Sequence, residues 1–252
     1  MALPTYVLLG LFGLLPSFIW MSYFLQRDSH PEPRSLLAKT FLTAMIVSPI
    51  AVFLQLGFTR ISVVTGSSFF ATNTPNFFLW AAFVEECVKF LAVWIIVLRN
   101  PAFDEPIDAM IYMMVAGLGF AAVENILFLF GSIPNGVGVT LSIWALRSVG
   151  ATLLHALSSS LIGYFLALSW FFQEHRKKLL LVGIALATLF HFSFNLFLSS
   201  TDNQLGGLSS ATGLLLVMAF LVSILFVKIK TRHRMAVAQA ALAASKINII
   251  AS

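Results

Sequence analysis

Six ionisable residues stand inside apolar stretches of this sequence. They are Glu85, Glu86 and Lys89 on one stretch, Glu124 on the next, His155 on the third and His191 on the fourth. An ionisable side chain at the centre of a membrane helix costs at least about 2.5–3.5 kcal/mol on insertion, so each one indicates a function. A single polar residue is often no more than a hydrogen bond between helices. Six on four successive stretches favour one shared chemical site.

Carboxylates and imidazoles at one site can activate water. A buried glutamate can act as general base, and histidines can bind a metal or stabilise an oxyanion, with Asn195 as a further donor. A catalytic zinc typically takes three protein ligands and keeps one position open. His155, His191 and Glu124 could supply those ligands, and a site without metal satisfies the same pattern. The HExxH motif of the common zinc proteases is absent.

Spacing along the helices predicts how these residues are divided. Glu85 and Lys89 are four residues apart, so we expect them to pair, which would keep that carboxylate ionised. Glu86 is rotated by about 100° from Glu85 around the helix, so it needs a different role. It could hold Lys89 or a neighbouring helix while Glu85 faces a cavity.

Small residues accompany the polar ones at helical spacing. One stripe comprises Ala151, His155, Ser159 and Gly163, and another comprises Gly117, Ala121 and Asn125. Small side chains on one helix face permit close backbone approach in membranes. We therefore expect these two helices to pack tightly beside the site, with Ser159 and Asn125 supporting it.

The elements that position these residues are apolar stretches long enough to cross a bilayer, which takes about 20 residues. The predicted fold is an all-α bundle of about seven spans, at about 3–25, 36–57, 76–98, 107–131, 148–172, 178–199 and 208–229. Residues 139–147 would overextend the fifth span, so we expect an interfacial turn or a tilted extension there. Residues 1–230 are predicted to form one catalytic membrane domain, followed by a basic, Ala-rich tail at 231–252.

Charge distribution predicts the orientation. Twelve of the 15 Lys and Arg residues, Arg27 among them, lie after the first, third or fifth span or at the C-terminal end, whereas only Arg60 lies in an opposite loop. The positive-inside rule then places the N-terminus outside and the C-terminus in the cytoplasm. With a rise of about 1.5 Å per residue, the key Glu and His side chains fall roughly 10–14 Å below the outer surface.

Composition excludes other classes. Hydrophobic residues make up 59% of the 252 residues and charged residues only 10%, as expected for a multi-pass protein of the cell membrane. The net charge of +5 comes from short clusters between apolar stretches. We therefore interpret it as a determinant of topology and expect no nucleic-acid partner. With a single cysteine, Cys87, an internal disulfide is impossible.

Four motifs in order resemble the PrsW family of membrane proteases. They are Glu-Glu-Cys-Val-Lys at 85–89, Asp-Glu-Pro-Ile-Asp at 104–108 with Gly-Leu-Gly-Phe-Ala-Ala-Val-Glu-Asn at 117–125, His-Ala-Leu at 155–157 with Gly-Tyr at 163–164, and His-Phe-Ser-Phe-Asn at 191–195. They resemble the EExxK, DxPxD with GLGFAxxEN, third and HxxxN motifs of that family. The resemblance covers residues 76–199, about half of the chain.

The resemblance implies an intramembrane endopeptidase that makes the first cut in a membrane-anchored anti-sigma factor, with a single-pass membrane protein as its substrate. It implies catalytic roles for Glu85, Glu86, Glu124, His155, His191 and Asn195, with Lys89, Asn125 and Ser159 in support. Related prenyl endopeptidases carry EExxxR and FxxxH, whereas this chain has Lys89 and Phe120-x-x-x-Glu124. That difference favours the PrsW branch.

Two other functions fit membrane-embedded Glu and His residues. A proton-coupled transporter uses such residues as a relay, but here they share one depth and the two halves of the chain show no repeat. A non-catalytic scaffold that keeps the fold is the second alternative. Asp104, Glu105 and Asp108 lie at the cytoplasmic start of a span, far from the site, so we expect a structural or regulatory role for them.

Overall fold

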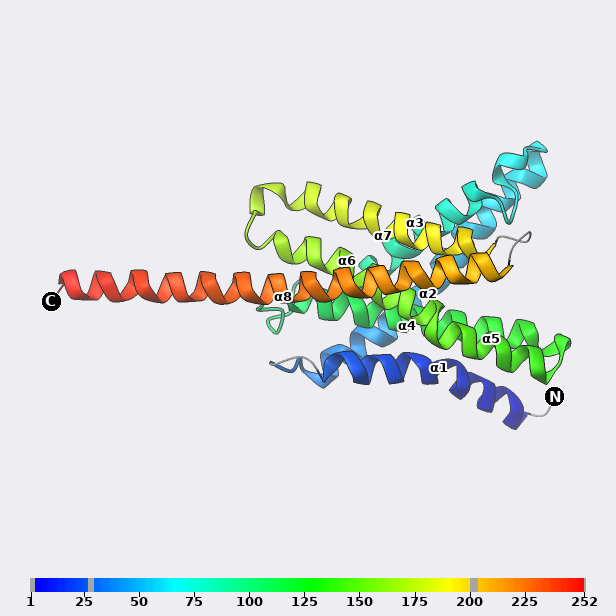
Figure 1. Ribbon diagram of the computed structural model, residues 1–252, viewed down its shortest axis with the longest axis horizontal. Helices are drawn as coiled ribbons and strands as arrows, with labels where there is room; N and C mark the ends of the chain where they lie inside the picture. Colours follow the sequence, from blue (N-terminus) through cyan, green and yellow to red (C-terminus); the bar gives the residue numbers. More distant parts are fainter. Residues whose placement is uncertain (1–2, 27–29, 200–203, 252) are drawn as a thin grey trace.

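The computed structural model describes residues 3–26, 30–199 and 204–251, and these are all-α (Figure 1). The α-helices are α1 (Leu3–Leu25), α2 (Arg34–Thr65), α3 (Pro75–Ile96), α4 (Asp108–Ser132), α5 (Val137–Val149), α6 (Ala151–Leu168), α7 (Arg176–Leu198) and α8 (Gln204–Ala251). Short 3-10 turns lie at Ser68–Phe70, Ile133–Asn135 and Gln173–His175. The all-α prediction is confirmed.

Successive long helices run in opposite directions. The ends of α1, α3, α6 and α8 lie on the left of Figure 1, and the ends of α2, α4 and α7 lie on the right with the N-terminus. The predicted basic clusters, such as 176–178 and 228–234, therefore gather at one end of the bundle, which we call the basic end. Arg27 lies outside the described residues.

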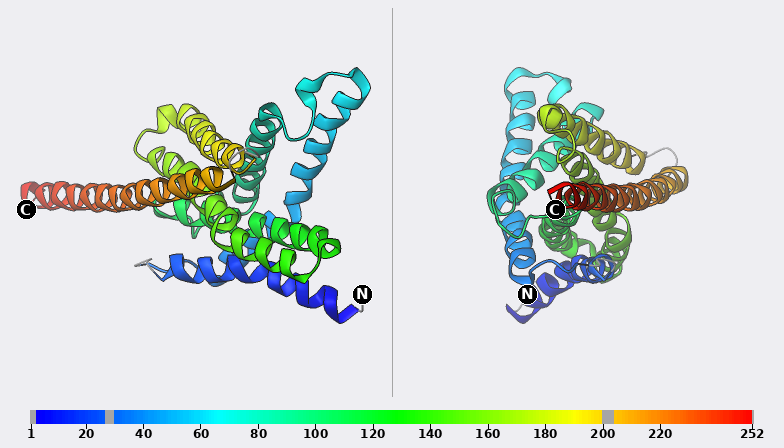
Figure 2. Two further views of the ribbon diagram at one scale, coloured as in Figure 1. Left: turned by 45° about the vertical axis from the view of Figure 1, so that its right-hand side comes forward. Right: turned by 90° about the vertical axis from the view of Figure 1, so that its left-hand side faces the viewer.

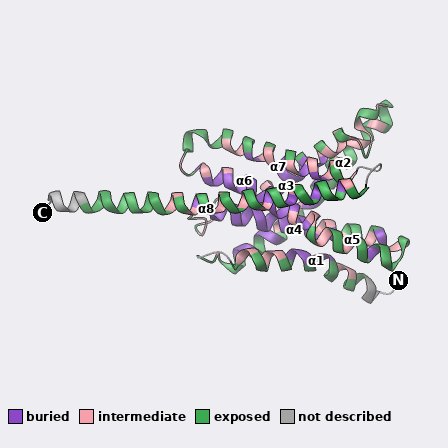
Figure 3. Ribbon diagram, viewed as in Figure 1, coloured by how far each residue is buried: buried purple, intermediate pink, exposed green. Residues whose placement is uncertain are grey.

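Six helical segments are long and apolar enough to cross a membrane: α1, α2, α4, α5 with α6, α7 and α8. Much of their surface is exposed and apolar, as a bilayer requires (Figure 3). The expected span at 76–98 corresponds to α3, whose 22 residues are long enough but include three charged side chains. All three are buried, so α3 turns its charges toward the bundle.

Residues 139–147 belong to a separate helix, α5, which returns antiparallel along the end of α4 (Figure 1). Trp144 Nε1 donates to the carbonyl of Phe12 over 2.9 Å, which ties α5 to α1. Gly150 separates α5 from α6 with φ −75° and ψ −80°. The expected extension is therefore a helix that ends at this break.

The C-terminal tail is helical. α8 continues without a break across residues 230 and 231, and its last part projects beyond the bundle (Figure 2). Residues 234–245 are exposed. Nothing in the fold tests the division into a domain and a tail at residue 230, which stays a prediction.

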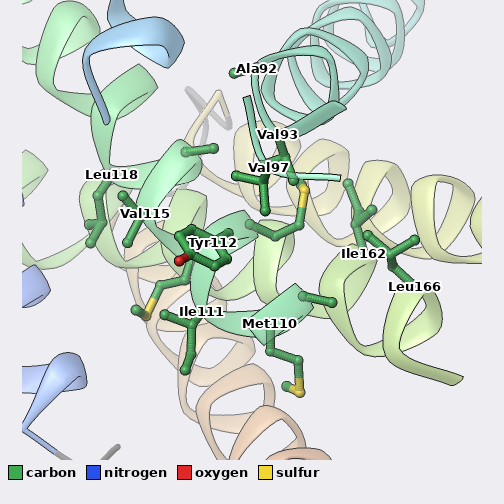
Figure 4. Packing of buried hydrophobic residues seen from close by; sticks show 14 of the residues in the cluster. Ala92, Val93, Val97, Met110, Ile111, Tyr112, Val115, Leu118, Ile162 and Leu166 are labelled. Atoms are coloured by element: carbon green, nitrogen blue, oxygen red, sulfur yellow. The ribbon is translucent and has the colours of Figure 1, made fainter. Parts of the chain in front are cut away.

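The most buried helix is α4, which packs against α1, α2 and α6. A Cβ at Gly117 would collide with the carbonyl of His155, and one at Gly163 would collide with the carbonyl of Ala109. The predicted close approach of the small-residue stripes is thus confirmed. Towards the basic end, Val97, Tyr112 and Ile162 bring α3, α4 and α6 into one apolar cluster (Figure 4).

Candidate active site

The start of α3 sets the position of its charged residues. Thr74 caps the helix, accepting from the backbone N–H of Phe77 over 3.2 Å, and Pro75 occupies the first turn. Trp80 Nε1 donates to the carbonyl of Leu54 over 3.2 Å and fixes α3 against α2. Glu85 and Glu86 follow one to two turns later, in the middle of the helix.

Glu86 is fully buried and joins three helices. Its Oε1 accepts from Lys89 Nζ at 2.7 Å, from Ser158 Oγ on α6 at 2.8 Å and from His191 Nδ1 on α7 at 2.9 Å. Ser159 Oγ approaches Oε2 at 3.5 Å. Because a carboxylate can only accept, the proton of His191 is assigned to Nδ1, and Nε2 keeps its lone pair.

Glu85 points away from this network. Its Oε1 accepts from Gln55 Nε2 on α2 at 2.9 Å, and its buried Oε2 has no hydrogen-bond partner. The nearest imidazole atom to Oε2 is Nε2 of His191, at 3.5 Å. A buried polar atom without a partner is rare in folded proteins, and such atoms concentrate at functional sites.

Glu124 does for His155 what Glu86 does for His191. Its Oε2 lies 2.8 Å from Arg147 Nη2 and 3.1 Å from His155 Nε2. The proton of His155 is thereby assigned to Nε2, which leaves Nδ1 bare, and Nδ1 is buried without a partner. The two rings stand 5.0 Å apart and perpendicular.

These side chains surround one cavity of about 550 Å³. Glu85, Glu124, His155 and His191 all line it, as predicted from their common depth, and Asn195 lines it as well. Glu86 and Lys89 do not. The cavity extends to Asn73 and Ser199, at the helix ends opposite the basic end.

Glu85, His155 and His191 form a group that fits a metal ion. Each offers a ligand atom within 4.8 Å of the others, and all three side chains are buried. Two atoms of the group, Glu85 Oε2 and His155 Nδ1, lack any partner. Each histidine is also held at its second nitrogen by a carboxylate, as metal-ligating histidines usually are.

The predicted metal set included Glu124 in place of Glu85, and the geometry differs. Glu124 stands outside the group because Arg147 and His155 already share its Oε2. The sequence gave no means to foresee this, since Arg147 is 23 residues further along the chain. Glu85 supplies the carboxylate instead.

The predicted pairing of Lys89 with Glu85 is also wrong. Lys89 forms an ion pair with Glu86, three residues away, because Glu85 faces the opposite way, into the cavity. The expected division of roles between the two glutamates is nonetheless present. Ser159 and Asn125 lie beside the site, as expected, Ser159 next to Glu86 and Asn125 next to Arg147.

The acidic motif at 104–108 is far from the cavity and organises a turn. Asp108 Oδ2 accepts from the backbone N–H groups of Asp104 at 3.0 Å and Glu105 at 2.8 Å. Tyr112 Oη donates to Glu32 Oε2 over 2.5 Å. These contacts fit the structural role expected for this motif.

Sequence reasoning missed three residues of the site: Gln55, Arg147 and Ser158. Gln55 and Arg147 were each visible as an isolated polar residue within an apolar run, the same signal that marked Glu124. Ser158 was hidden in a run of three serines, of which Ser159 alone continued the four-residue spacing.

Known proteins match this chain over most of its length. A family model described as "PrsW family intramembrane metalloprotease" matches residues 32–227. The protein named Protease PrsW of Bacillus subtilis is 31% identical over 194 residues, 76% of this chain and 83% of that protein. Its namesake in Geobacillus kaustophilus is 30% identical over 180 residues, 71% of this chain and 74% of that protein. No solved structure matches.

Proposed function

Because the chain belongs to the PrsW family of intramembrane metalloproteases, we propose that it cleaves a single-pass protein of the cell membrane inside the cavity between α3, α4, α6 and α7. The observation that carries this proposal is the pair of buried, unpartnered atoms, Glu85 Oε2 and His155 Nδ1, at the lining of that cavity. An anti-sigma factor with one membrane span is the kind of substrate that the motifs imply.

Glu85, His155 and His191 would hold the metal ion. Two imidazoles and one carboxylate are a donor set that catalytic zinc uses, so we propose zinc. When bound, zinc would lower the pKa of water and polarise the carbonyl of the scissile peptide.

The side chains of the protein prepare this reaction. Glu86, held by Lys89 and Ser158, orients His191, and Glu124 orients His155. Gln55 fixes one oxygen of Glu85, so that the other meets whatever occupies the cavity.

Asn195 lies one helical turn beyond His191 and lines the cavity with it. Its amide can donate to the oxygen on which negative charge develops as the peptide is attacked.

We further propose that the cut falls near the extracytoplasmic surface. The cavity extends to Asn73 and Ser199, opposite the basic end, and basic ends face the cytoplasm. Water reaches the site from that side along the cavity. A substrate helix must unwind to expose a peptide bond, which is easiest near its end at the membrane interface, where water can satisfy the backbone.

The test compares wild type, Glu85→Gln and the matched control Glu174→Gln, an exposed glutamate at the basic end, on one candidate single-pass substrate in the same cells. Wild type and Glu174→Gln should cleave, and Glu85→Gln should not. Mass spectrometry then locates the cut. Cleavage by Glu85→Gln would refute the catalytic assignment, and a scissile bond at the cytoplasmic side would refute the proposed orientation.

A further inference from the structure

Arg147 occupies the last turn of α5 and grips two neighbouring residues of α4. Its Nε donates to Asn125 Oδ1 and its Nη2 donates to Glu124 Oε2, both over 2.8 Å. The guanidinium lies 3.9 Å from the centre of the Phe128 ring, and its side chain is 15% exposed. A planar guanidinium held on three sides has one orientation.

A ring of hydrogen bonds locks this grip to the backbone. Asn125 Nδ2 donates to Thr152 Oγ1 at 2.9 Å, and Thr152 Oγ1 donates back to the carbonyl of Arg147 at 2.9 Å. The ring spans the break at Gly150, so the junction between α5 and α6 is fixed relative to α4. Both α6, which carries His155, and the guanidinium are thereby placed by one network.

The network ends at His155. Glu124 uses one oxygen, Oε2, for both Arg147 and His155 Nε2. Where the guanidinium holds that oxygen, the imidazole must present Nε2–H to it and turn Nδ1 away. Nδ1 is the buried atom without a partner.

We propose that Arg147 is a positioning residue that acts through Glu124 to fix the ring and tautomer of His155. The proposal rests on the function proposed above, in which His155 helps to hold a metal. A lysine cannot replace the arginine, because a single ammonium group lacks the planar fork that reaches Asn125 Oδ1 and Glu124 Oε2 together.

The test uses purified full-length protein and a cleavable single-pass substrate. Arg147→Ala should lower kcat by about 10–100-fold, as loss of an outer partner of a metal ligand does, with KM unchanged. Added guanidinium ion should restore cleavage by Arg147→Ala, because Arg147 lines an accessible cavity. It should not restore Glu124→Ala, which lacks the intermediary. Arg147→Ala should also bind zinc about 10-fold more weakly in a chelator competition.

Several results would overturn the proposal. A raised KM with unchanged kcat would mean that Arg147 binds substrate directly. A defect in Arg147→Ala that guanidinium leaves untouched would mean that the residue serves only the fold. If Arg147→Ala fails to fold, Arg147→Lys decides, since wild-type kcat and zinc affinity there would contradict the need for a fork. Failure of the proposed function itself looks different, because Glu85→Gln would then remain active.

Discussion

His191 donates from Nδ1 to Oε1 of Glu86 over 2.9 Å. The same oxygen also accepts from Lys89 and Ser158, so Glu86 is occupied within the bundle and lines no part of the cavity. Glu85, its neighbour in the sequence, keeps one oxygen unpartnered beside the other nitrogen of the same ring. Two adjacent glutamates thus orient and face a single histidine, and their substitution should have different consequences.

Glu85→Gln should nearly abolish cleavage and leave stability almost unchanged, because the amide can still accept from Gln55. Glu86→Gln should lower the free energy of unfolding by about 3–5 kcal/mol, since it leaves the fully buried Lys89 without its counter-charge. Thermal unfolding in detergent, measured beside cleavage, separates the two effects. A stable, inactive Glu86→Gln would show that this carboxylate takes part in the chemistry.

Lys89 should matter for stability in the same way. Lys89→Ala removes the counter-charge of Glu86 and should destabilise the protein by about 3–5 kcal/mol, whereas Lys178→Ala, on the exposed start of α7, should change little. The double variant Lys89→Met with Glu86→Gln should recover much of the loss, because no uncompensated charge remains. Strictly additive losses in the double variant would contradict the pairing.

The buried Glu, His, His group predicts about one zinc ion per chain in the purified protein. Removal of metal by a chelator should abolish cleavage, and added zinc should restore it. His155→Ala and His191→Ala should each lose metal and activity, while His175→Ala, an exposed residue at the basic end, should keep both. Full activity in protein shown by elemental analysis to be metal-free would rule out the metal site.

Close packing at Gly117 should be as sensitive as the polar groups. A Cβ there meets the His155 carbonyl and Ser159 Oγ, so Gly117→Ala should cost about 1–3 kcal/mol by overpacking and displace His155. Gly131→Ala, near the end of the same helix, meets nothing within 4 Å and should be neutral or stabilising by up to about 1 kcal/mol. Equal stability of the two variants would mean that α4 and α6 can separate without loss.

The helices and the meeting of Glu85, Glu124, His155 and His191 could be predicted because hydrophobic length fixes the spans and the helical rise fixes depth along them. The partners of each group could not. Pairing of Lys89 with Glu86 instead of Glu85 depends on which face of α3 meets α6 and α7, and a rotation of about 100° exchanges the two. Arg147 depends on α5 turning back along α4, which residues 139–147 do not specify.

The orientation remains a prediction from charge, and it decides where the substrate is cut. Ser199, which lines the cavity, and Ser245, on the projecting part of α8, are both serines within hydrogen-bonding reach of helical carbonyls, so each can become cysteine with little change in size. In a background with Cys87→Ser, a membrane-impermeant thiol reagent added to intact cells should label Ser199→Cys. It should label Ser245→Cys only after the cells are opened, because the basic end faces the cytoplasm. The reverse pattern would place the cavity mouth in the cytoplasm, and the cut with it.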